Sequence, residues 1–97
     1  MRVLIVDDEA TIRRTTLLAV KSMGHEPFEA PTGSRALKLL DEEPCDVCFL
    51  DLKLANEDGL EVLGRLQKAF PEVAVVMFTA YATIATAVEA MRRGAFD

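Results

Sequence analysis

Val47-Cys48-Phe49-Leu50-Asp51 is a run of four largely apolar residues that ends abruptly in a carboxylate. A short apolar run of this kind is typical of a strand that is buried within a parallel sheet. Asp51 is then expected at the carboxyl end of the strand, and that edge is where open α/β sheets bind their ligands.

Two other apolar runs end in polar residues. Residues 3–6 are followed by Asp7 and Asp8, and residues 73–78 are followed by Thr79. If all three strands are parallel, their carboxyl ends meet at one edge, so four polar side chains, counting Asp51, are expected to converge there.

Amphipathic segments separate the apolar runs. We expect strands at 2–6, 25–30, 46–50 and 73–78 and helices at 9–23, 33–42, 59–70 and 83–93. Residues 52–58 are expected to form a loop, and 95–97 to open a further strand. Pro27 places the second strand at a sheet edge, and Thr32 is a good cap for the second helix. Strands that alternate with helices predict βα units and a parallel sheet.

The first helix carries an apolar stripe at helical spacing. The residues expected to face inward are Ile12, Thr16, Ala19, Val20 and Met23. The residues expected to face outward are Arg13, Arg14, Leu17 and Lys21. A mixed leucine and basic face fits a transient protein interface as well as an ordinary solvated surface. Asp8 is expected to cap the start of this helix.

Composition restricts the class of protein. The chain of 97 residues suffices for one domain, and its 51% hydrophobic content is enough for a core. The net charge of −5 disfavours binding to nucleic acid or to a membrane surface. Residues 73–88 are uncharged but too short for a spanning helix. With only two cysteines and no secretory signal before the first strand, a cytoplasmic protein is expected.

Cys45 and Cys48 have a C-x-x-C spacing, but the pair enters a strand rather than a helix N-terminus. A redox pair needs its first thiolate stabilised at such an N-terminus. We therefore expect Cys48 in the core and Cys45 in a loop.

The acidic residues Asp7, Asp8 and Asp51 predict a metal site, although acids near helix N-termini are also common caps. Like charges in a shared site repel, and a divalent cation removes that penalty. Carboxylates with carbonyls and waters suit Mg²⁺, and the cluster lacks the His or Cys that zinc or copper would favour. A bound cation would make Asp51 usable as a nucleophile toward a phosphoryl group. Thr79 could donate its hydroxyl to that group, and the small Ala80 leaves room for it.

At these residues the chain resembles the receiver domain of bacterial two-component response regulators. The matching stretches are Val6-Asp7-Asp8-Glu9, Leu50-Asp51-Leu52, Asp58-Gly59-Leu60, Thr79-Ala80 and Arg93-Gly94-Ala95-Phe96-Asp97. The resemblance covers the whole chain. It implies a doubly wound, flavodoxin-like α/β fold with the strand order 2-1-3-4-5.

The resemblance also implies roles for the site residues. Asp51 resembles the phosphoacceptor, which takes a phosphoryl group from a phosphohistidine on a sensor histidine kinase. Asp8 and Asp51 resemble direct Mg²⁺ ligands, whereas Asp7 acts through a metal-bound water. The backbone carbonyl of Lys53 resembles the third protein ligand.

The phosphoryl pocket implied by the resemblance consists of Lys53, Thr79 and Ala80. Thr79 resembles the switch hydroxyl that turns inward when the domain is phosphorylated. The run 79–91 is similar to receivers of nitrogen-regulator-type, sigma-54-dependent activators, which carry an ATPase module and a DNA-binding domain. Photosynthesis-type regulators with a simpler DNA-binding output have a similar run.

The chain departs from the family in two places. Ala55 stands where the family often has proline, which affects loop rigidity rather than the chemistry. The chain also ends at Asp97, before the family's phosphoryl-binding lysine, the rest of strand five and the last helix. We therefore expect residues 1–97 to be a receiver domain that is incomplete at its C-terminus. The unpaired edge of its fourth strand would invite pairing with a second copy, that is, a homodimer.

Two alternatives to a phosphorylation switch stay open at this point. A Mg²⁺-dependent phosphatase with an aspartyl-phosphate intermediate would need a second acid two residues after its nucleophile, where this chain has Lys53. A pseudo-receiver that is never phosphorylated would suit the missing lysine.

Overall fold

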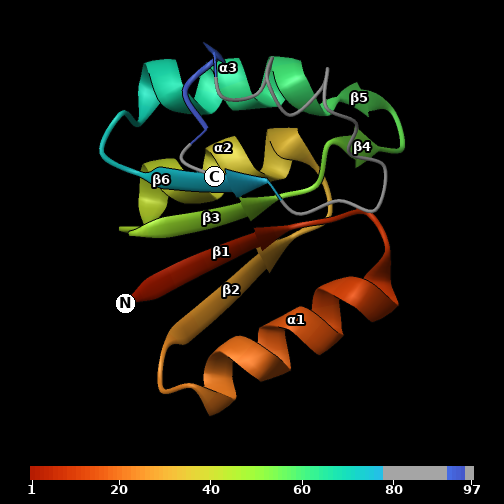
Figure 1. Cartoon of the computed structure of the whole chain (residues 1–97), viewed down its shortest axis with the longest axis vertical. Coiled ribbons are helices and arrows are strands. Elements are labelled where there is room, and N and C mark those ends of the chain that lie inside the picture. The colour runs from red at the N-terminus through yellow and green to blue at the C-terminus, as the bar shows by residue number, and fades with distance from the viewer. Residues whose placement is uncertain (78–91, 96–97) are drawn as a thin grey trace.

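A parallel four-stranded sheet in the order β2-β1-β3-β6 forms the centre of the computed structural model, which describes residues 1–77 and 92–95 (Figure 1). The strands are β1 (Arg2–Val6), β2 (Glu26–Ala30), β3 (Val47–Leu50) and β6 (Ala74–Met77). The helices are α1 (Ala10–Ser22), α2 (Gly33–Glu42) and α3 (Gly59–Ala69). Thr79, Ala80 and most of the helix expected at 83–93 lie outside the described residues.

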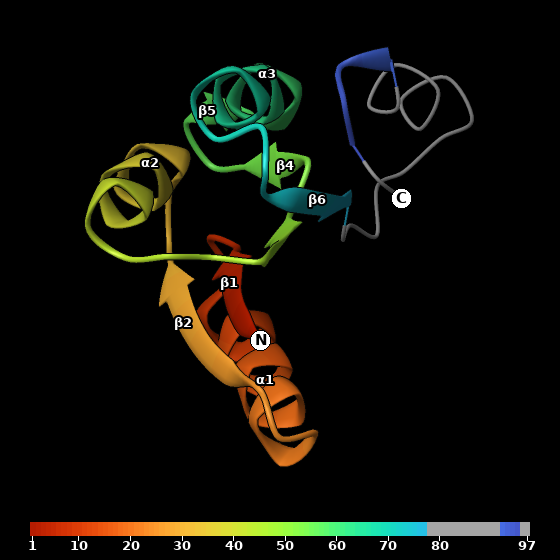
Figure 2. The ribbon, with the colours of Figure 1, turned by 90° about the vertical axis from the view of Figure 1, so that its left-hand side faces the viewer.

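Helices cover both faces of this sheet, as a doubly wound fold requires. α1 lies on one face, and α2 and α3 lie on the other (Figures 1 and 2). The expected order 2-1-3-4 is confirmed for the four described strands, with Pro27 on the edge strand β2. Within residues 1–77 and 92–95, no helix combines the length and the apolar character that a membrane crossing needs.

Alternation along the strands divides the core into two clusters. Val3 and Ile5 of β1 pack with Val20 on the α1 side, and Leu4 and Val6 pack on the side of α2 and α3. These four residues are at most 3% exposed, because a central parallel strand is covered on both faces. This explains why the strand reads as a continuous apolar run.

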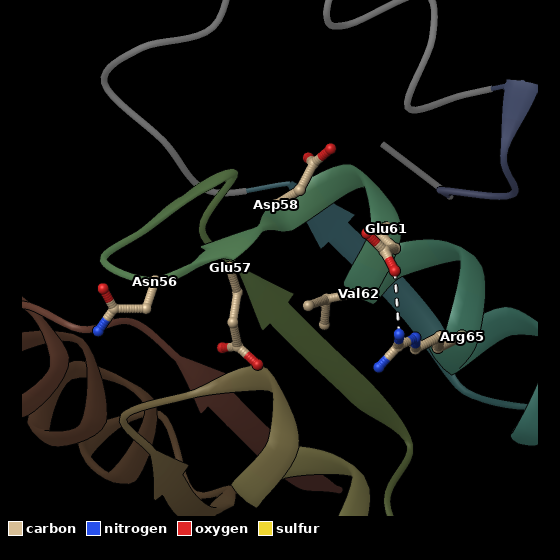
Figure 3. Close-up of a pocket in the computed structure, with 6 residues that line it drawn as sticks. All are labelled: Asn56, Glu57, Asp58, Glu61, Val62 and Arg65. Atoms are coloured by element: carbon tan, nitrogen blue, oxygen red, sulfur yellow. Dashed lines mark hydrogen bonds and ion pairs between the residues drawn. The ribbon is translucent and has the colours of Figure 1, made fainter.

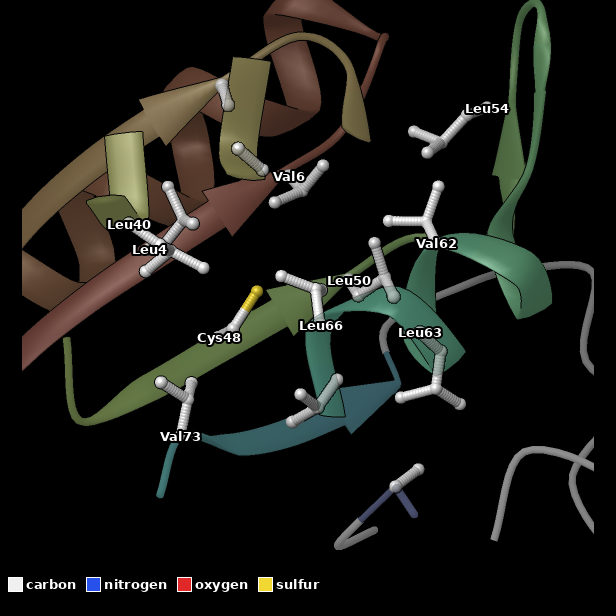
Figure 4. Close-up of a cluster of buried hydrophobic side chains, with 14 residues drawn as sticks. Leu4, Val6, Leu40, Cys48, Leu50, Leu54, Val62, Leu63, Leu66 and Val73 are labelled. Atoms are coloured by element: carbon white, nitrogen blue, oxygen red, sulfur yellow. The ribbon is translucent and has the colours of Figure 1, made fainter. Parts of the chain in front are cut away.

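The larger cluster lies between the sheet and the two helices α2 and α3 (Figure 4). Leu50 and Cys48 of β3 and Leu63 and Leu66 of α3 are each 0% exposed. The expected core position of Cys48 is confirmed, and burial raises the pKa of its thiol. Cys45 is partly buried against the same cluster, and both cysteines are free.

The register of the sheet aligns the carboxyl ends of its strands. Val6 lies opposite both Ala30 and Leu50, and Leu50 lies opposite Met77. The ladder continues one residue further, where the Asp51 amide donates to the Val6 carbonyl at 3.0 Å. The residues that follow the strands therefore begin at the same level.

The expected buried face of α1 is only partly confirmed, because Val20 is buried and Thr16 partly buried. Three of the residues expected inward are exposed: Ile12, Ala19 and Met23. Val20 packs against the sheet as expected, and it is joined there by Leu17 and Arg13, which were expected to face outward. The guanidinium of Arg13 donates to a carboxylate on β2 and to a backbone carbonyl beyond β1, so polar contacts rather than apolar spacing set this face.

The expected loop at 52–58 contains regular structure. Two short antiparallel strands, β4 (Lys53–Leu54) and β5 (Glu57–Asp58), form a small hairpin between β3 and α3. Two-residue strands are too short to show an alternating pattern, which is why the sequence did not indicate them.

Replacing Leu66 by alanine should lower the free energy of unfolding by about 2–5 kcal/mol, because Leu66 is fully buried where α3 meets the sheet. Leu18→Ala is the matched control, since Leu18 is 64% exposed and its truncation should cost less than about 0.5 kcal/mol. Urea denaturation measures both values. Equal losses would contradict the placement of α3.

Candidate functional site

Three aspartates gather at the carboxyl edge of the sheet. Asp7 and Asp8 follow β1, Asp51 follows β3, and one carboxylate oxygen from each lies within 4.8 Å of the others. This convergence was expected, and the pairing of β1 with β3 produces it. The exposure of the three side chains increases from Asp7, which is 2% exposed, through the half-buried Asp51 to the exposed Asp8. The cluster is thus anchored at its base and open at its rim.

Asp7 is held by the turn that leads into α1. Its carboxylate accepts a hydrogen bond from the Glu9 amide at 2.9 Å, and its own amide donates to Ala30 at 3.2 Å. The expected capping role of Asp8 is wrong. Glu9 is the N-cap residue of α1, and its side chain makes no capping hydrogen bond. Asp7 binds the Glu9 amide instead, so the Asp8 carboxylate is available to the cluster.

Arg13 lies beneath the acidic turn, although the sequence placed it on the outer face of α1. Its guanidinium donates to the Asp7 carbonyl at 2.8 Å and to the Glu29 carboxylate at 3.0 Å. A basic residue one to two turns into the helix that follows an acidic pair is the signal that could have indicated this contact.

The pKa of Asp7 is raised above its ordinary value. Burial is the main cause, and the negative charges of Asp51 and Asp8 add to it. The Glu9 amide and the charge of Arg13 act in the opposite direction but do not outweigh it. The cluster therefore carries an electrostatic cost that a bound cation would relieve.

Asp51 is fixed by the hairpin that follows it. Its carboxylate accepts a hydrogen bond from the Lys53 amide at 3.0 Å, and the Lys53 side chain is exposed. An open hollow above Asp8 and Asp51 is lined by further residues from the start of α1 and from the β4–β5 hairpin: Glu9, Ala10, Ile12, Lys53, Leu54 and Ala55. Asp51 is thus both oriented by backbone and reachable from solvent. Metal coordination by the Lys53 carbonyl stays a prediction.

The stretch Asp58-Gly59-Leu60 closes the hairpin. The Gly59 amide donates to the Leu52 carbonyl at 3.1 Å, and a Cβ at this position would overlap the Leu52 backbone. The Asp58 carboxylate accepts from the Leu60 amide at 3.0 Å and so caps α3. Only glycine permits the chain to pass this close to the residue after Asp51. Thr79 and Ala80, which complete the expected site, lie outside the described residues.

A family model described as "Response regulator receiver domain" matches residues 3–97. The chain belongs to this family. Members of the family typically bind Mg²⁺ at an acidic pocket, and in this receiver domain the aspartate cluster forms such a pocket.

The curated relatives include a transcriptional regulatory protein. The alginate biosynthesis transcriptional regulatory protein AlgB of Pseudomonas aeruginosa is 40% identical over 96 residues, which is 99% of this receiver domain and 21% of AlgB. The receiver domain therefore spans about a fifth of the length of such relatives (21%).

Solved receiver structures superpose closely on this one. The receiver domain of NtrX from Brucella abortus has a TM-score of 0.91 at 38% identity, covering 98% of this chain and 81% of that one. A response regulator from Burkholderia pseudomallei has a TM-score of 0.92 at 32% identity, covering 97% of this chain and 55% of that one. The expected family and fold are confirmed.

Asp7→Asn should stabilise the receiver domain at neutral pH when divalent cations are chelated. Between the ordinary aspartate pKa of about 3.9 and the raised value, the folded state binds more protons than the unfolded state. The free energy of unfolding of the wild type therefore falls as the pH rises through that interval, whereas asparagine does not titrate. Urea denaturation in EDTA across the acidic range should show a higher free energy of unfolding for Asp7→Asn than for the wild type, and this difference should disappear below about pH 3.9.

Asp41→Asn is the control for this measurement, because it removes an exposed carboxylate from α2 and changes the net charge equally. A similar gain in Asp41→Asn, or a loss of stability in Asp7→Asn at neutral pH, would contradict the assigned cause.

Gly59→Ala should destabilise the receiver domain by about 1–3 kcal/mol and weaken Mg²⁺ binding, since the new Cβ forces Leu52 away from its place beside Asp51. Gly64→Ala on the same helix meets nothing within 4 Å and should stabilise by about 0.4–1 kcal/mol. Thermal unfolding and a Mg²⁺ titration followed by NMR measure the two effects. Equivalent behaviour of the two variants would refute the proposed close approach.

Proposed function

We propose that this receiver domain accepts a phosphoryl group on Asp51 from a sensor histidine kinase, in a Mg²⁺-dependent reaction, and signals by a conformational change. The observation that carries the proposal is the half-exposed Asp51 carboxylate, held by the Lys53 amide within 4.8 Å of two further carboxylates. Membership of the receiver family supports the same role.

The proposed reaction forms an acyl phosphate. An oxygen of the Asp51 carboxylate attacks the phosphorus of a phosphohistidine, the new O–P bond forms, and the P–N bond breaks. The electron pair of that bond stays on the imidazole nitrogen. The Lys53 amide keeps the carboxylate in one orientation during the attack, as its 3.0 Å hydrogen bond to the carboxylate indicates.

The residues present fit a magnesium ion. We assign Asp8 and Asp51 as direct ligands, Asp7 as a ligand through water, and the Lys53 carbonyl as the third protein ligand. The donor set is made of oxygens only, which is what Mg²⁺ prefers. When bound, the ion would neutralise the charge that develops between the carboxylates and the phosphoryl oxygens. Arg13, the cation that touches Asp7, leaves the pKa of that carboxyl raised, so charge compensation by the protein is incomplete.

The response is proposed to be a shift between two conformations. Thr79 would donate its hydroxyl to the phosphoryl group, and Lys53 and Ala80 would complete the pocket around it. The Burkholderia pseudomallei relative is described with a phosphorylated aspartic acid and a calcium ion, which supports an aspartyl phosphate beside a divalent cation in this fold.

The partners proposed are a sensor histidine kinase and, within the complete protein, an output domain with ATPase and DNA-binding parts. The relative AlgB is a transcriptional regulatory protein, which supports a transcriptional output. If the kinase docks on α1, its contacts would include the exposed Ile12 and Leu18 rather than the partly buried Arg13 and Leu17. We place the protein in the cytoplasm, where such kinases deliver their phosphoryl groups.

The domain is proposed to be a phosphoacceptor that catalyses only its own phosphorylation and dephosphorylation. A phosphatase would need an acid two residues after the nucleophile to protonate the leaving group. Lys53 occupies that position, and its amide is used to bind Asp51.

Incubation of the purified protein with acetyl phosphate and Mg²⁺ should add one phosphoryl group, detected by intact mass analysis. Asp51→Asn should abolish the adduct, because the amide is not a nucleophile. Asp46→Asn, at the opposite end of the same strand, is the control and should react as the wild type does. An adduct that survives Asp51→Asn, or none on the wild type, would overturn the proposal.

A further inference from the structure

Some of the free backbone amides at the N-terminus of α2 donate to a residue that lies far away in the sequence. Thr32 caps the helix locally, because its hydroxyl accepts from the Arg35 amide at 3.1 Å. The amides of Gly33 and Ser34 instead donate to the two carboxylate oxygens of Glu57, at 2.6 and 3.1 Å. The Ser34 hydroxyl donates to the same carboxylate at 3.1 Å. Glu57 thus binds the helix end that Thr32 leaves open.

This contact joins α2 to the hairpin of the proposed site. Glu57 belongs to β5, and its side chain points from the hairpin toward the start of α2, whereas Asp58 points away (Figure 3). β5 pairs with β4, where Glu57 lies opposite Leu54 and Asp58 opposite Lys53. The Lys53 amide in turn binds the Asp51 carboxylate. Hydrogen bonds at both ends, with the strand pairing and the backbone of the hairpin between them, therefore connect α2 to the phosphoacceptor.

Charge and packing both strengthen the contact. A carboxylate at a helix N-terminus is favoured by the helix dipole and by charge-assisted hydrogen bonds. A Cβ on Gly33 would lie 2.5 Å from the Val62 side chain and 3.2 Å from the Glu57 carboxylate, so glycine allows this close approach. Ala36 and Leu40 anchor α2 in the core. The hairpin is therefore tied to an element that cannot easily move.

The covalent structure of the hairpin does not supply this rigidity, because its turn contains Ala55 rather than a residue with a fixed φ angle. One end of the hairpin is held by the approach of Gly59 to Leu52. The β5 strand of the hairpin is held to α2 by Glu57.

We propose that Glu57 is a positioning residue: by binding the N-terminus of α2 it fixes the β4–β5 hairpin, and through the Lys53 backbone it orients Asp51 and the metal site. This inference rests on the proposed function, because it assigns Glu57 to the same reaction. Glu57 touches neither the metal nor the phosphoryl group and acts through the hairpin.

Glu57→Ala and Thr32→Ala form a matched pair for the test. Each removes side-chain acceptors from the same helix end, but only Glu57→Ala releases the hairpin. We expect Glu57→Ala to weaken Mg²⁺ binding by about tenfold, as loss of an indirect support of metal ligands typically does. Thr32→Ala should bind Mg²⁺ as the wild type does. Glu57→Gln keeps one carbonyl acceptor and should fall between the wild type and Glu57→Ala.

The measurements are a Mg²⁺ titration followed by NMR, hydrogen exchange at the Lys53 amide, and the rate of adduct formation with acetyl phosphate. Faster exchange at Lys53 in Glu57→Ala alone would support the proposal, because a loss of helix stability would affect both variants. If Glu57→Ala unfolds, the comparison of Glu57→Gln with Thr32→Ala decides the same question.

Equal Mg²⁺ affinity in Glu57→Ala and Thr32→Ala would overturn this proposal and leave the proposed function intact. A wild type that binds Mg²⁺ but takes no phosphoryl group would overturn the proposed function. The Mg²⁺ titrations of Glu57→Ala and Thr32→Ala would still test the role of Glu57 independently. A wild type that binds no Mg²⁺ would overturn both.

Discussion

The parallel pairing of β1 with β3 is the constraint on which the site depends. Because Val6 lies opposite Leu50, the residues that follow, Asp7 and Asp51, leave the sheet side by side. A one-residue slip would turn every side chain of one strand to the other face and separate the two acids. The apolar alternation that separates the two clusters of the core therefore also specifies the geometry of the carboxylates.

This geometry has an electrostatic cost that is part of the proposed chemistry. Asp7 is buried beside two other acids, and its pKa is raised even though Arg13 and the Glu9 amide oppose the shift. A protein optimised for stability alone would have no reason to assemble such a cluster. The Glu9 and Lys53 amides orient the Asp7 and Asp51 carboxylates, and Arg13 binds the Asp7 carbonyl rather than its carboxylate. A bound cation would supply further charge compensation.

Much of this arrangement was predictable because it depends on local patterns. Strands and helices followed from apolar runs, and Thr32 as the cap of α2 and Pro27 on an edge strand followed from residue type. The family resemblance correctly implied the strand order, and strand ends indicated the acidic cluster. The inward face of α1 was only partly right: Val20 is buried as expected, but Arg13 turns inward to bind Glu29 and the Asp7 carbonyl, contacts that apolar spacing does not report.

The sequence alone thus determined which segments are strands, which acids follow them and which family the chain resembles, since these depend on residue type and short-range spacing. Only the tertiary structure decided how the site is supported: the Asp7 contact with the Glu9 amide, the closure of the hairpin at Gly59 and the binding of Glu57 to α2. The contact between Glu57 and Gly33 spans 24 residues. No local pattern can encode such a contact, because the packing of α2 and α3 on one face of the sheet is what brings its two ends together.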